Sequence, residues 1–204
     1  MKSKGYLITF EGPEGSGKST QIRLAVNFLR KKGYPILLLR EPGGTPTGEA
    51  IREVLLNKRL KAMTPETELL LYLAARAQLV REKINPSLKQ GKIVIVDRFE
   101  DSTVAYQGFA GGVPLKTIEE LSKFARGNLK PNLTILLDVE TQVGLKRSGR
   151  GDRIEKKSVA FHEKVRKGFL TLARREPQRF LVVPPGLSIE VVRKKIEEKL
   201  DERF

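Results

Sequence analysis

The stretch FEGPEGSGKST, residues 10–20, restricts the possible folds of this chain more than any other part of its sequence. Glycine loses more backbone freedom on folding than any other residue, so a cluster of glycines indicates positive φ angles or a ligand close to the main chain. The spacing from Gly12 to Gly17, Lys18 and Ser19 is that of a P-loop. In a P-loop, backbone N–H groups and the lysine bind phosphate groups, and the hydroxyl group binds Mg²⁺.

The residues on either side of this stretch have the pattern that a P-loop requires. Leu7–Phe10 has the composition of a short buried strand, and apolar residues then recur at helical spacing up to Lys32, before Gly33 as a stop signal. A helix that begins at the loop would add the positive end of its dipole to the anion site. A tight turn without a ligand is the alternative, but the sequence favours a site for a nucleoside triphosphate.

Composition excludes several classes of protein and site. The chain of 204 residues contains no cysteine, which excludes disulfides, thiolate metal sites and cysteine nucleophiles. Its length predicts a single domain, residues 1–204. We expect the one histidine, His162, to be a surface residue because it lies in a charged segment. No apolar run approaches the length of a membrane span, and no apolar segment precedes the first strand, so we expect a cytoplasmic protein without a membrane partner.

The formal net charge of +15 does not by itself identify a partner. Nucleic acid, a polyanionic nucleotide or a lysine-rich solvated surface would each account for it. Few basic residues alternate with aromatic ones, as a stacking platform for single strands would require.

Strand-like apolar runs alternate with helical patterns along the whole chain. The predicted strands are Leu7–Phe10, Ile36–Leu39, Ile93–Val96, Leu133–Leu137 and Phe180–Val183. The predicted helices lie near 19–32, 48–57, 65–90, 115–126, 141–147, 156–176 and 188–202. This alternation predicts an α/β fold, a three-layer sandwich with a parallel sheet. Ligands of such sheets bind at the carboxyl ends of the strands.

Charged residues follow two of the predicted strands at those ends. Arg40 and Glu41 precede a sharp loop that contains Pro42. Asp97 closes the third apolar strand, which is the Walker B position that serves Mg²⁺, and Arg98 follows it with a guanidinium group suited to phosphate. A buried structural salt bridge is the alternative interpretation of this pair.

Two further segments have features that suit contacts with a nucleotide. Tyr72 and Arg76 are four residues apart on one helix face, where the ring could stack on a base and the guanidinium group could hydrogen-bond it. The alternative is that Tyr72 packs in the core beside an arginine on the surface. The segment 146–153, KRSGRGDR, combines glycines with arginines. A charge run is usually a solvated face, but this composition also suits a mobile lid that neutralises phosphate charge.

Six motifs of the chain together resemble bacterial thymidylate kinase of the lid-arginine type, in the P-loop nucleoside monophosphate kinase family. They are FEGPEGSGKST, REPGGTPTGEAIR, YLAARAQLV, VDRFEDSTVAYQG, PNLTILLDV and LKRSGRGDRIE, and they occur in the family's order over nearly the whole chain. The resemblance implies transfer of the γ-phosphoryl group of ATP to dTMP, with Mg²⁺ as cofactor. It also implies a homodimer, no nucleic-acid partner and a five-stranded parallel sheet.

The resemblance further implies roles for individual residues. The ATP-binding residues would be Gly12, Pro13, Glu14, Gly15, Ser16, Gly17, Lys18, Ser19, Thr20 and Arg147. The dTMP-binding residues would be Glu14, Arg52, Tyr72, Arg76, Arg98, Phe99, Thr103 and Gln107. Ser19 and Asp97 would serve the metal, and the catalytic residues would be Lys18, Arg98, Arg150 and Arg153, the last two in a lid near 147–157.

The chain also departs from the family's common pattern. The other branch of the family carries an arginine inside the P-loop, where this chain has Gly15-Ser16, so the cation is expected from the lid. Phe99 stands where many relatives have Tyr, and Asn132 replaces the usual Asp. Val183–Leu187 differs from the common Asp-containing turn, so the detail of the adenine pocket is left open.

Two other functions remain possible at this point. A monophosphate kinase for dUMP or UMP is the nearer one, because thymine and uracil differ by one methyl group, worth only about 1–3 kcal/mol in a pocket. A nucleic-acid-dependent P-loop ATPase would account for the basic charge, but it would leave the Tyr72 and Arg76 pair unexplained.

Overall fold

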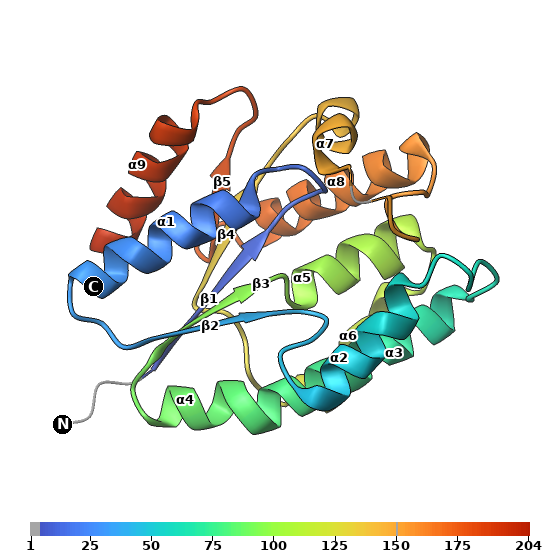
Figure 1. The fold of residues 1–204 in the computed structure, drawn as a ribbon, viewed down its shortest axis with the longest axis horizontal. Coiled ribbons are helices and arrows are strands. Elements are labelled where there is room, and N and C mark those ends of the chain that lie inside the picture. Colours follow the sequence, from blue (N-terminus) through green and yellow to red (C-terminus); the bar gives the residue numbers. More distant parts are fainter. Residues whose placement is uncertain (1–4, 150) are drawn as a thin grey trace.

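A five-stranded parallel sheet runs through the middle of the molecule in the computed structural model, which describes residues 5–149 and 151–204 (Figure 1). The strand order is β2-β3-β1-β4-β5. The strands are β1 (Tyr6–Glu11), β2 (Ile36–Arg40), β3 (Ile93–Asp97), β4 (Leu133–Leu137) and β5 (Phe180–Val183). This arrangement confirms the predicted five-stranded parallel sheet, and each predicted strand is present to within a residue at either end.

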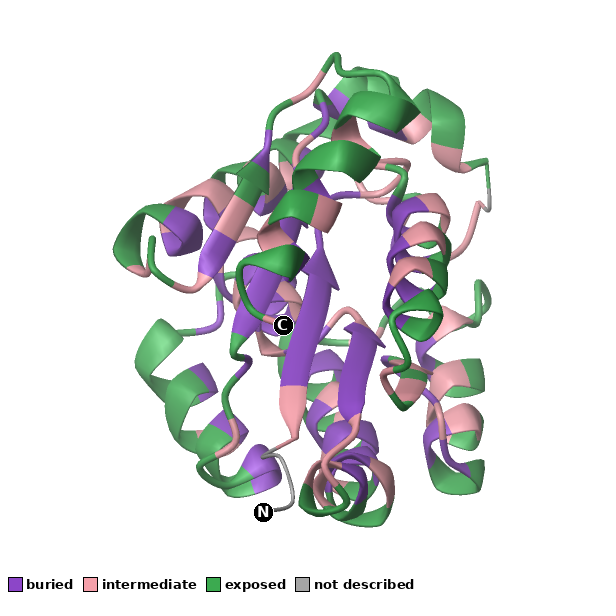
Figure 2. Cartoon of the chain, turned by 90° about the vertical axis from the view of Figure 1, so that its left-hand side faces the viewer, coloured by how far each residue is buried: buried purple, intermediate pink, exposed green. Residues whose placement is uncertain are grey.

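Helices cover both faces of the sheet. They are α1 (Lys18–Lys31), α2 (Pro46–Leu56), α3 (Pro65–Leu79), α4 (Asn85–Lys89), α5 (Glu100–Thr103), α6 (Leu115–Arg126), α7 (Thr141–Ser148), α8 (Val159–Arg175) and α9 (Ile189–Asp201). In Figure 1, α1 and α9 lie together on one face, and α3, α4, α6 and α8 lie on the other. Figure 2 shows buried residues along the strands and on the inner sides of the helices, and exposed residues on the outer sides. The molecule is therefore a three-layer sandwich.

Alternate residues of the strands pack against opposite helix layers. Ile8 and Phe10 of β1 belong to the cluster that contains Leu29 of α1 and Leu200 of α9. Leu7, which precedes Ile8, points to the opposite face of the sheet and packs with the cluster that contains Leu79 of α3 and Val94 of β3. Because successive strand side chains point to opposite faces, both helix layers need apolar partners, and most strand residues are apolar on both faces of the sheet.

The sheet register brings the ends of β1, β2 and β3 to one edge. Asp97, the last residue of β3, is in register with Phe10 of β1 and with Arg40 of β2. The loops that follow these strands start at the same edge, and they carry the P-loop and the two charged motifs. The fold thus confirms that the candidate site lies at the carboxyl ends of parallel strands.

Two regions differ from the predicted helices. The helix expected over 65–90 contains a π-helical segment, Val80–Ile84, directly before Pro86 in α4. Proline cannot donate an N–H and its ring needs space in the preceding turn, which explains an irregular turn there. The segment after β3 was not predicted as helix, yet it forms α5 and the π-helical segment Val104–Ala110. Its glycine and β-branched residues hide any helical periodicity.

None of the helices in the two described ranges is long and apolar enough to cross a membrane.

Candidate active site

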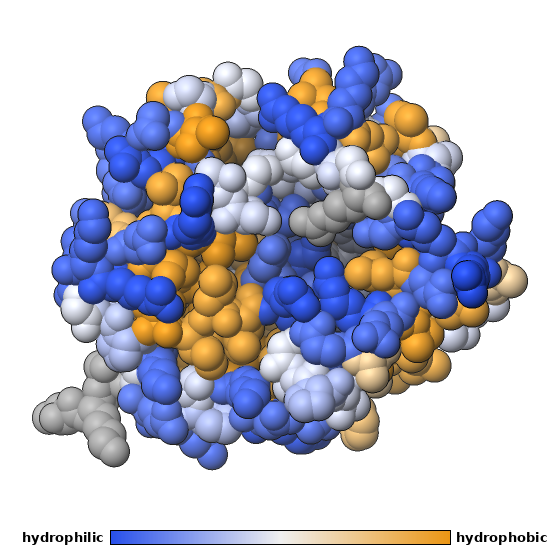
Figure 3. Space-filling model, viewed as in Figure 1, coloured by the Kyte–Doolittle hydropathy of each residue, from blue (hydrophilic) through white to orange (hydrophobic). Residues whose placement is uncertain are grey.

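A cavity of about 980 Å³ opens at the carboxyl edge of the sheet, between the P-loop and the helices that follow β2 and β3. Figure 3 shows its mouth as a hollow near the centre of that face. Sixteen of the residues predicted for the site line it: Glu14, Gly15, Ser16, Gly17, Lys18, Ser19, Thr20, Arg52, Tyr72, Arg76, Asp97, Arg98, Phe99, Thr103, Gln107 and Arg147. Gly12, Pro13 and Arg153 lie behind this lining, and Arg150 falls outside the described residues.

The P-loop connects β1 to α1 with its amide groups unused by side chains. Gly17, at the N-cap of α1, has φ 87°, and no described side chain caps the helix. The first N–H groups of a helix have no partner within the helix, and together with its dipole they form an anion site. The amides of the first turn are therefore available to phosphate oxygens.

Lys18 folds back over the loop that it follows. Its Nζ donates to the carbonyl oxygens of Gly12 at 3.0 Å and Pro13 at 2.8 Å, and to Ser16 Oγ at 3.2 Å. Burial, together with the nearby Arg98, lowers the pKa of Lys18 to about 7, against the attraction of Glu14 and Asp97. An anion beside Nζ would favour the charged form, so phosphate binding and protonation of Lys18 reinforce each other.

Helix α7 packs directly on the P-loop backbone. Gly15 has φ 66°, and a Cβ atom at this position would lie 2.0 Å from the carbonyl oxygen of Gly144 in α7. A Cβ atom at Gly144 would in turn lie 2.4 Å from the carbonyl oxygen of Glu14. The two glycines allow α7 and the P-loop to touch main chain to main chain.

The carboxylate of Asp97 has a buried oxygen atom that is available to a ligand. Its Oδ1 is buried and has no hydrogen-bond partner in residues 5–149 or 151–204. Buried polar atoms normally have partners, so this orphan atom calls for one. The described residues contain no cluster of three acidic or histidine side chains, but Mg²⁺ is usually held by one or two side chains and by substrate phosphates. Asp97 and Ser19 fit that mode of binding.

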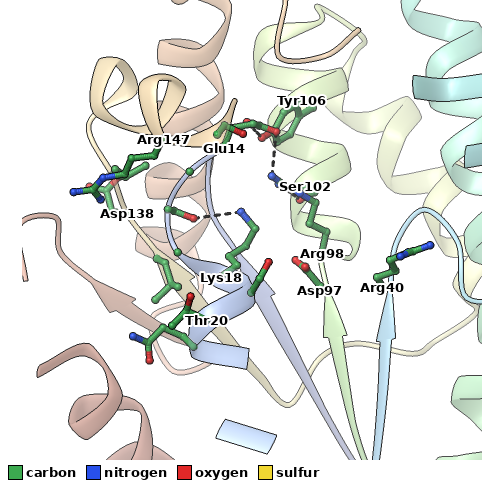
Figure 4. Close-up of a pocket in the computed structure, with 18 of the residues that line it drawn as sticks. Glu14, Lys18, Thr20, Arg40, Asp97, Arg98, Ser102, Tyr106, Asp138 and Arg147 are labelled. Carbon is green, nitrogen blue, oxygen red and sulfur yellow. Dashed lines mark hydrogen bonds and ion pairs between the residues drawn. The ribbon is translucent and has the colours of Figure 1, made fainter. Parts of the chain in front are cut away.

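Arg98 and Glu14 form an ion pair that lines the cavity, whereas Asp97 and Arg98 form no salt bridge with each other among the described residues. Arg98 Nη2 lies 3.1 Å from Glu14 Oε1, and Nη1 donates to the carbonyl oxygen of Gly12 at 3.0 Å. Burial alone would raise the pKa of Glu14, but Arg98 and Lys18 outweigh it and hold this pKa below its usual range. Figure 4 shows Asp97 and Arg98 at the end of β3, facing Lys18 at the start of α1.

His162 is not the surface residue that we predicted. Its side chain is 2% exposed, and Nδ1 lies 3.7 Å from Glu14 Oε2. The charged neighbours in the sequence lie on other faces of α8, and His162 faces inward with Val165 and Phe169. His162 is buried because its position in the helix places it on the same face as Val165 and Phe169, and the charge of its neighbours in the sequence does not change this.

Tyr72 and Arg76 meet at the cavity as predicted, but Arg76 is not a surface arginine. Its side chain is 1% exposed and its Nη2 bonds Glu41 Oε2 at 2.6 Å and Thr103 Oγ1 at 2.9 Å. Nη1 is buried without a hydrogen-bond partner among the described residues. The buried Glu41 carboxylate thus compensates most of a buried charge, and one donor of Arg76 remains for a ligand.

The other predicted substrate residues take different places around this pair. Phe99 is fully buried, and the Arg76 guanidinium lies 5.0 Å from its ring centre, so Phe99 supports Arg76 from behind. Gln107 donates to Glu68 at 2.8 Å. Arg52 donates to the carbonyl oxygen of Pro42 at 2.9 Å.

Arg153, predicted as a lid arginine, forms a buried ion pair on the opposite side from the P-loop. Its Nη1 lies 2.6 Å from Glu68 Oε2, and its Nε donates to the carbonyl oxygen of Leu55 at 2.8 Å. Arg147 at the end of α7 lines the cavity on the side of Asp138 and Val183–Leu187 (Figure 4). These residues and Tyr72 line the same cavity.

The sequence analysis singled out Glu41 without giving it a partner, and it missed three further residues in or beside the site, Glu68, Ser102 and Tyr106. Glu41 holds Arg76, Glu68 holds Arg153, and Tyr106 donates its hydroxyl to Glu14. Ser102 bonds Arg98 Nη1 at 3.1 Å. Ser102 and Tyr106 lie in the segment after β3 that has no clear helical periodicity, so no sequence pattern placed their side chains at the site.

The family model for thymidylate kinase matches residues 10–196 of the chain. The chain belongs to the thymidylate kinase family.

Relatives in this family match the chain over nearly its whole length. The thymidylate kinase of Geotalea daltonii is 50% identical over 199 residues, covering 93% of both chains. That of Symbiobacterium thermophilum is 48% identical over 203 residues, covering 97% of this chain and 95% of the relative. The crystal structure of thymidylate kinase from Ehrlichia chaffeensis superposes with a TM-score of 0.80 at 33% identity, covering 96% and 98% of the two chains.

The contact between Gly15 and Gly144 predicts that this member of the family cannot accept an arginine at position 15. We expect Gly15→Arg to lose most activity, because its Cβ would overlap the carbonyl oxygen of Gly144 and push α7 away from the loop. Gly33→Arg is the matched control: Gly33 also has positive φ, 85°, but a Cβ there meets no atom within 4 Å. Both variants place a non-glycine residue at positive φ, which costs roughly 1 kcal/mol of stability in each. A difference between the two variants in kcat/KM or in the free energy of unfolding therefore measures the effect of the overlap with Gly144. Equal activity of the two variants would contradict the prediction.

Proposed function

We propose that the chain transfers the γ-phosphoryl group of ATP to dTMP, giving ADP and dTDP. The observation that carries this proposal is a single cavity with a P-loop at one end and a base-sized pocket at the other, in a chain of the thymidylate kinase family. Arg98 stands between the two ends, where the reacting phosphates of donor and acceptor would meet.

ATP binds on the side of the P-loop. The amides from Gly15 to Thr20 and the Lys18 ammonium group bind its phosphates, and Arg147 lies beside its adenine. Ser19 and Asp97 would hold the Mg²⁺ that accompanies ATP. The metal would supply positive charge that neutralises the phosphates during the transfer.

The acceptor binds on the side of α3. Tyr72 stacks on thymine, and the spare Nη1 donor of Arg76 bonds a carbonyl oxygen of the base. Glu14 meets the sugar hydroxyl group, and Thr103 and Gln107 complete the wall of the pocket. Arg52 and Arg98 approach the phosphate, with Phe99 as the support beneath Arg76.

The reaction needs alignment and charge neutralisation. An oxygen of the dTMP phosphate attacks the γ-phosphorus, and the bond from that phosphorus to the bridging oxygen breaks as ADP leaves. The attacking oxygen is already anionic, so no strong base is required. Lys18 and Arg98 are placed to stabilise negative charge that shifts during the transfer.

Family membership does not favour the alternative functions. The thymidylate kinase family match covers the chain from the P-loop to α9, and a nucleic-acid-dependent ATPase would have no use for the side of the cavity that Tyr72 and the buried Arg76 line. Discrimination against dUMP rests on one methyl group and is expected to be modest, about 10–200-fold.

We also propose that the protein forms a homodimer in the cytoplasm. Leu70 of α3 and Phe124 of α6 are 55% and 79% exposed, and the two helices pack side by side. A second copy of the chain would cover these apolar side chains, which are exposed to water in the single chain. The mass of the purified protein by light scattering tests the dimer, and a monomer at micromolar concentration would contradict it.

The function is tested by ADP release with a panel of acceptors. We expect ADP release from ATP to depend on a monophosphate, with dTMP preferred over dUMP, UMP and AMP, and to be unaffected by DNA or RNA. Lys18→Ala should lower turnover by roughly 10²–10³-fold, because a positioned donor to the phosphates is lost. Lys164→Ala, an exposed lysine of α8, is the control. Stimulation by nucleic acid without any monophosphate would contradict the proposal.

The lid arginines supply the second prediction for this function. With no arginine at Gly15-Ser16, we expect Arg150 or Arg153 to neutralise charge on the transferring group. For Arg153, this requires leaving its ion pair with Glu68. At least one of Arg150→Ala and Arg153→Ala should lower kcat by roughly 10²-fold or more with little change in KM. Wild-type kcat in the double variant, measured at saturating ATP and dTMP, would show that the lid is only a solvated loop.

A further inference from the structure

Arg98 adopts a backbone conformation that needs support. Its φ is 68°, and it is the only non-glycine residue in the two described ranges with positive φ. Such residues persist where the surrounding contacts determine their conformation, and they concentrate at functional sites. The contacts that hold Arg98 therefore bear on how the site works.

One buried carboxylate reaches both the backbone and the side chain of this region. Glu11, the last residue of β1, is fully buried. Its Oε1 accepts the N–H of Phe99 at 2.7 Å, which fixes the peptide that follows Arg98. Its Oε2 accepts the hydroxyl hydrogen of Ser102 at 2.6 Å.

Ser102 passes this support on to the guanidinium group. Because its hydrogen is donated to Glu11, its oxygen faces Arg98 as an acceptor, and Arg98 Nη1 lies 3.1 Å away. The carbonyl oxygen of Gly12 accepts from the same Nη1 at 3.0 Å. Nη1 is thus held from two sides, by β1 through Glu11 and Ser102 and by the P-loop through Gly12.

The other nitrogen of the guanidinium group is held differently. Nη2 bonds Glu14 Oε1 at 3.1 Å, and Glu14 has further contacts with Tyr106 and His162. A phosphate group entering the cavity can replace Glu14 at Nη2 while Nη1 keeps its position. Glu14 would then remain in place through Tyr106 and His162, so the exchange leaves no carboxylate unsupported.

We propose that Glu11 is a positioning residue that acts through Ser102, holding Nη1 of Arg98 so that Nη2 meets the phosphate of the monophosphate substrate. Glu11 does not line the cavity, whereas Ser102 and Arg98 do. The inference rests on the proposed function in one respect, the role of Arg98 as a ligand of the dTMP phosphate.

The contribution of the phosphate is measured by comparing dTMP with thymidine, which lacks it. For each variant, the dissociation constant of thymidine is divided by that of dTMP, and this ratio measures how much the phosphate strengthens binding. Calorimetry or fluorescence titration supplies both dissociation constants. We expect Ser102→Ala to lower this ratio by roughly 3- to 10-fold, the effect of one hydrogen bond, with thymidine binding unchanged. Ser122→Ala is the matched control, because Ser122 is fully buried in α6 and its Oγ has no partner among the described residues.

A double-mutant cycle tests the path through Glu11. The amide oxygen of Glu11→Gln can still accept the Phe99 N–H, but its NH₂ group faces Ser102 and cannot accept the hydroxyl hydrogen. We expect Glu11→Gln to lower the ratio like Ser102→Ala, and the double variant to lower it little further, because both act on one path. If Glu11→Gln does not fold, Ser102→Ala alone decides.

Each outcome separates this inference from the proposed function. If Arg98→Ala removes the preference for dTMP but Ser102→Ala keeps it, the positioning role is wrong and the phosphate site stands. Equal weakening of dTMP and thymidine by Ser102→Ala would show a merely structural role and overturn the inference. If Arg98→Ala itself keeps the preference, the proposed role of Arg98 is wrong, and the inference fails with it.

Discussion

The packing of the P-loop backbone between β4 and α7 is the constraint on which the rest of the site depends. A Cβ atom at Gly12 would lie 2.3 Å from the carbonyl oxygen of Leu137 at the end of β4, and one at Gly15 would overlap Gly144 of α7. The loop therefore has no room for side chains on these sides, and its amides face the cavity. Lys18 folds over the same loop, and the loops after β2 and β3 close the cavity around it. This packing excludes an arginine at position 15 of the loop.

Carboxylates balance three cations in and behind the cavity wall, two of them buried. Arg76 pairs with Glu41, Arg98 with Glu14, and Arg153 with Glu68. A charge removed from water without a partner costs several kcal/mol, so these pairs keep the empty cavity stable. A substrate phosphate would compete with Glu14 for Nη2 of Arg98, while Tyr106 keeps its hydrogen bond to Glu14. Arg98 is therefore the cation of the site that can exchange a carboxylate for a phosphate.

The sheet, its parallel direction and the P-loop could be predicted because they depend on short-range patterns. Apolar runs predicted the five strands, and the glycine spacing predicted the loop at the start of α1. The partners of the arginines could not be predicted in this way, because Glu41 and Arg76 are 35 residues apart and meet only through the fold. His162 was misplaced because charged neighbours outweighed its helical position. The π-helical segments near Pro86 and after Arg98 have no periodicity that a sequence pattern can show. No polar residue beside Glu11 in the sequence indicates its role. Glu11 reaches Phe99 and Ser102 because β1 pairs with β3 in the sheet.

The central claim is that one cavity binds ATP and the monophosphate at the same time, with their phosphates end to end. A ligand that joins adenosine to thymidine through five phosphates tests it most directly, because it must occupy both ends of the cavity. We predict one binding site per chain, competition with both ATP and dTMP, and an affinity at least roughly 10²-fold higher than that of either nucleotide alone. Competition with ATP only, at an affinity no higher than that of ATP, would contradict the account.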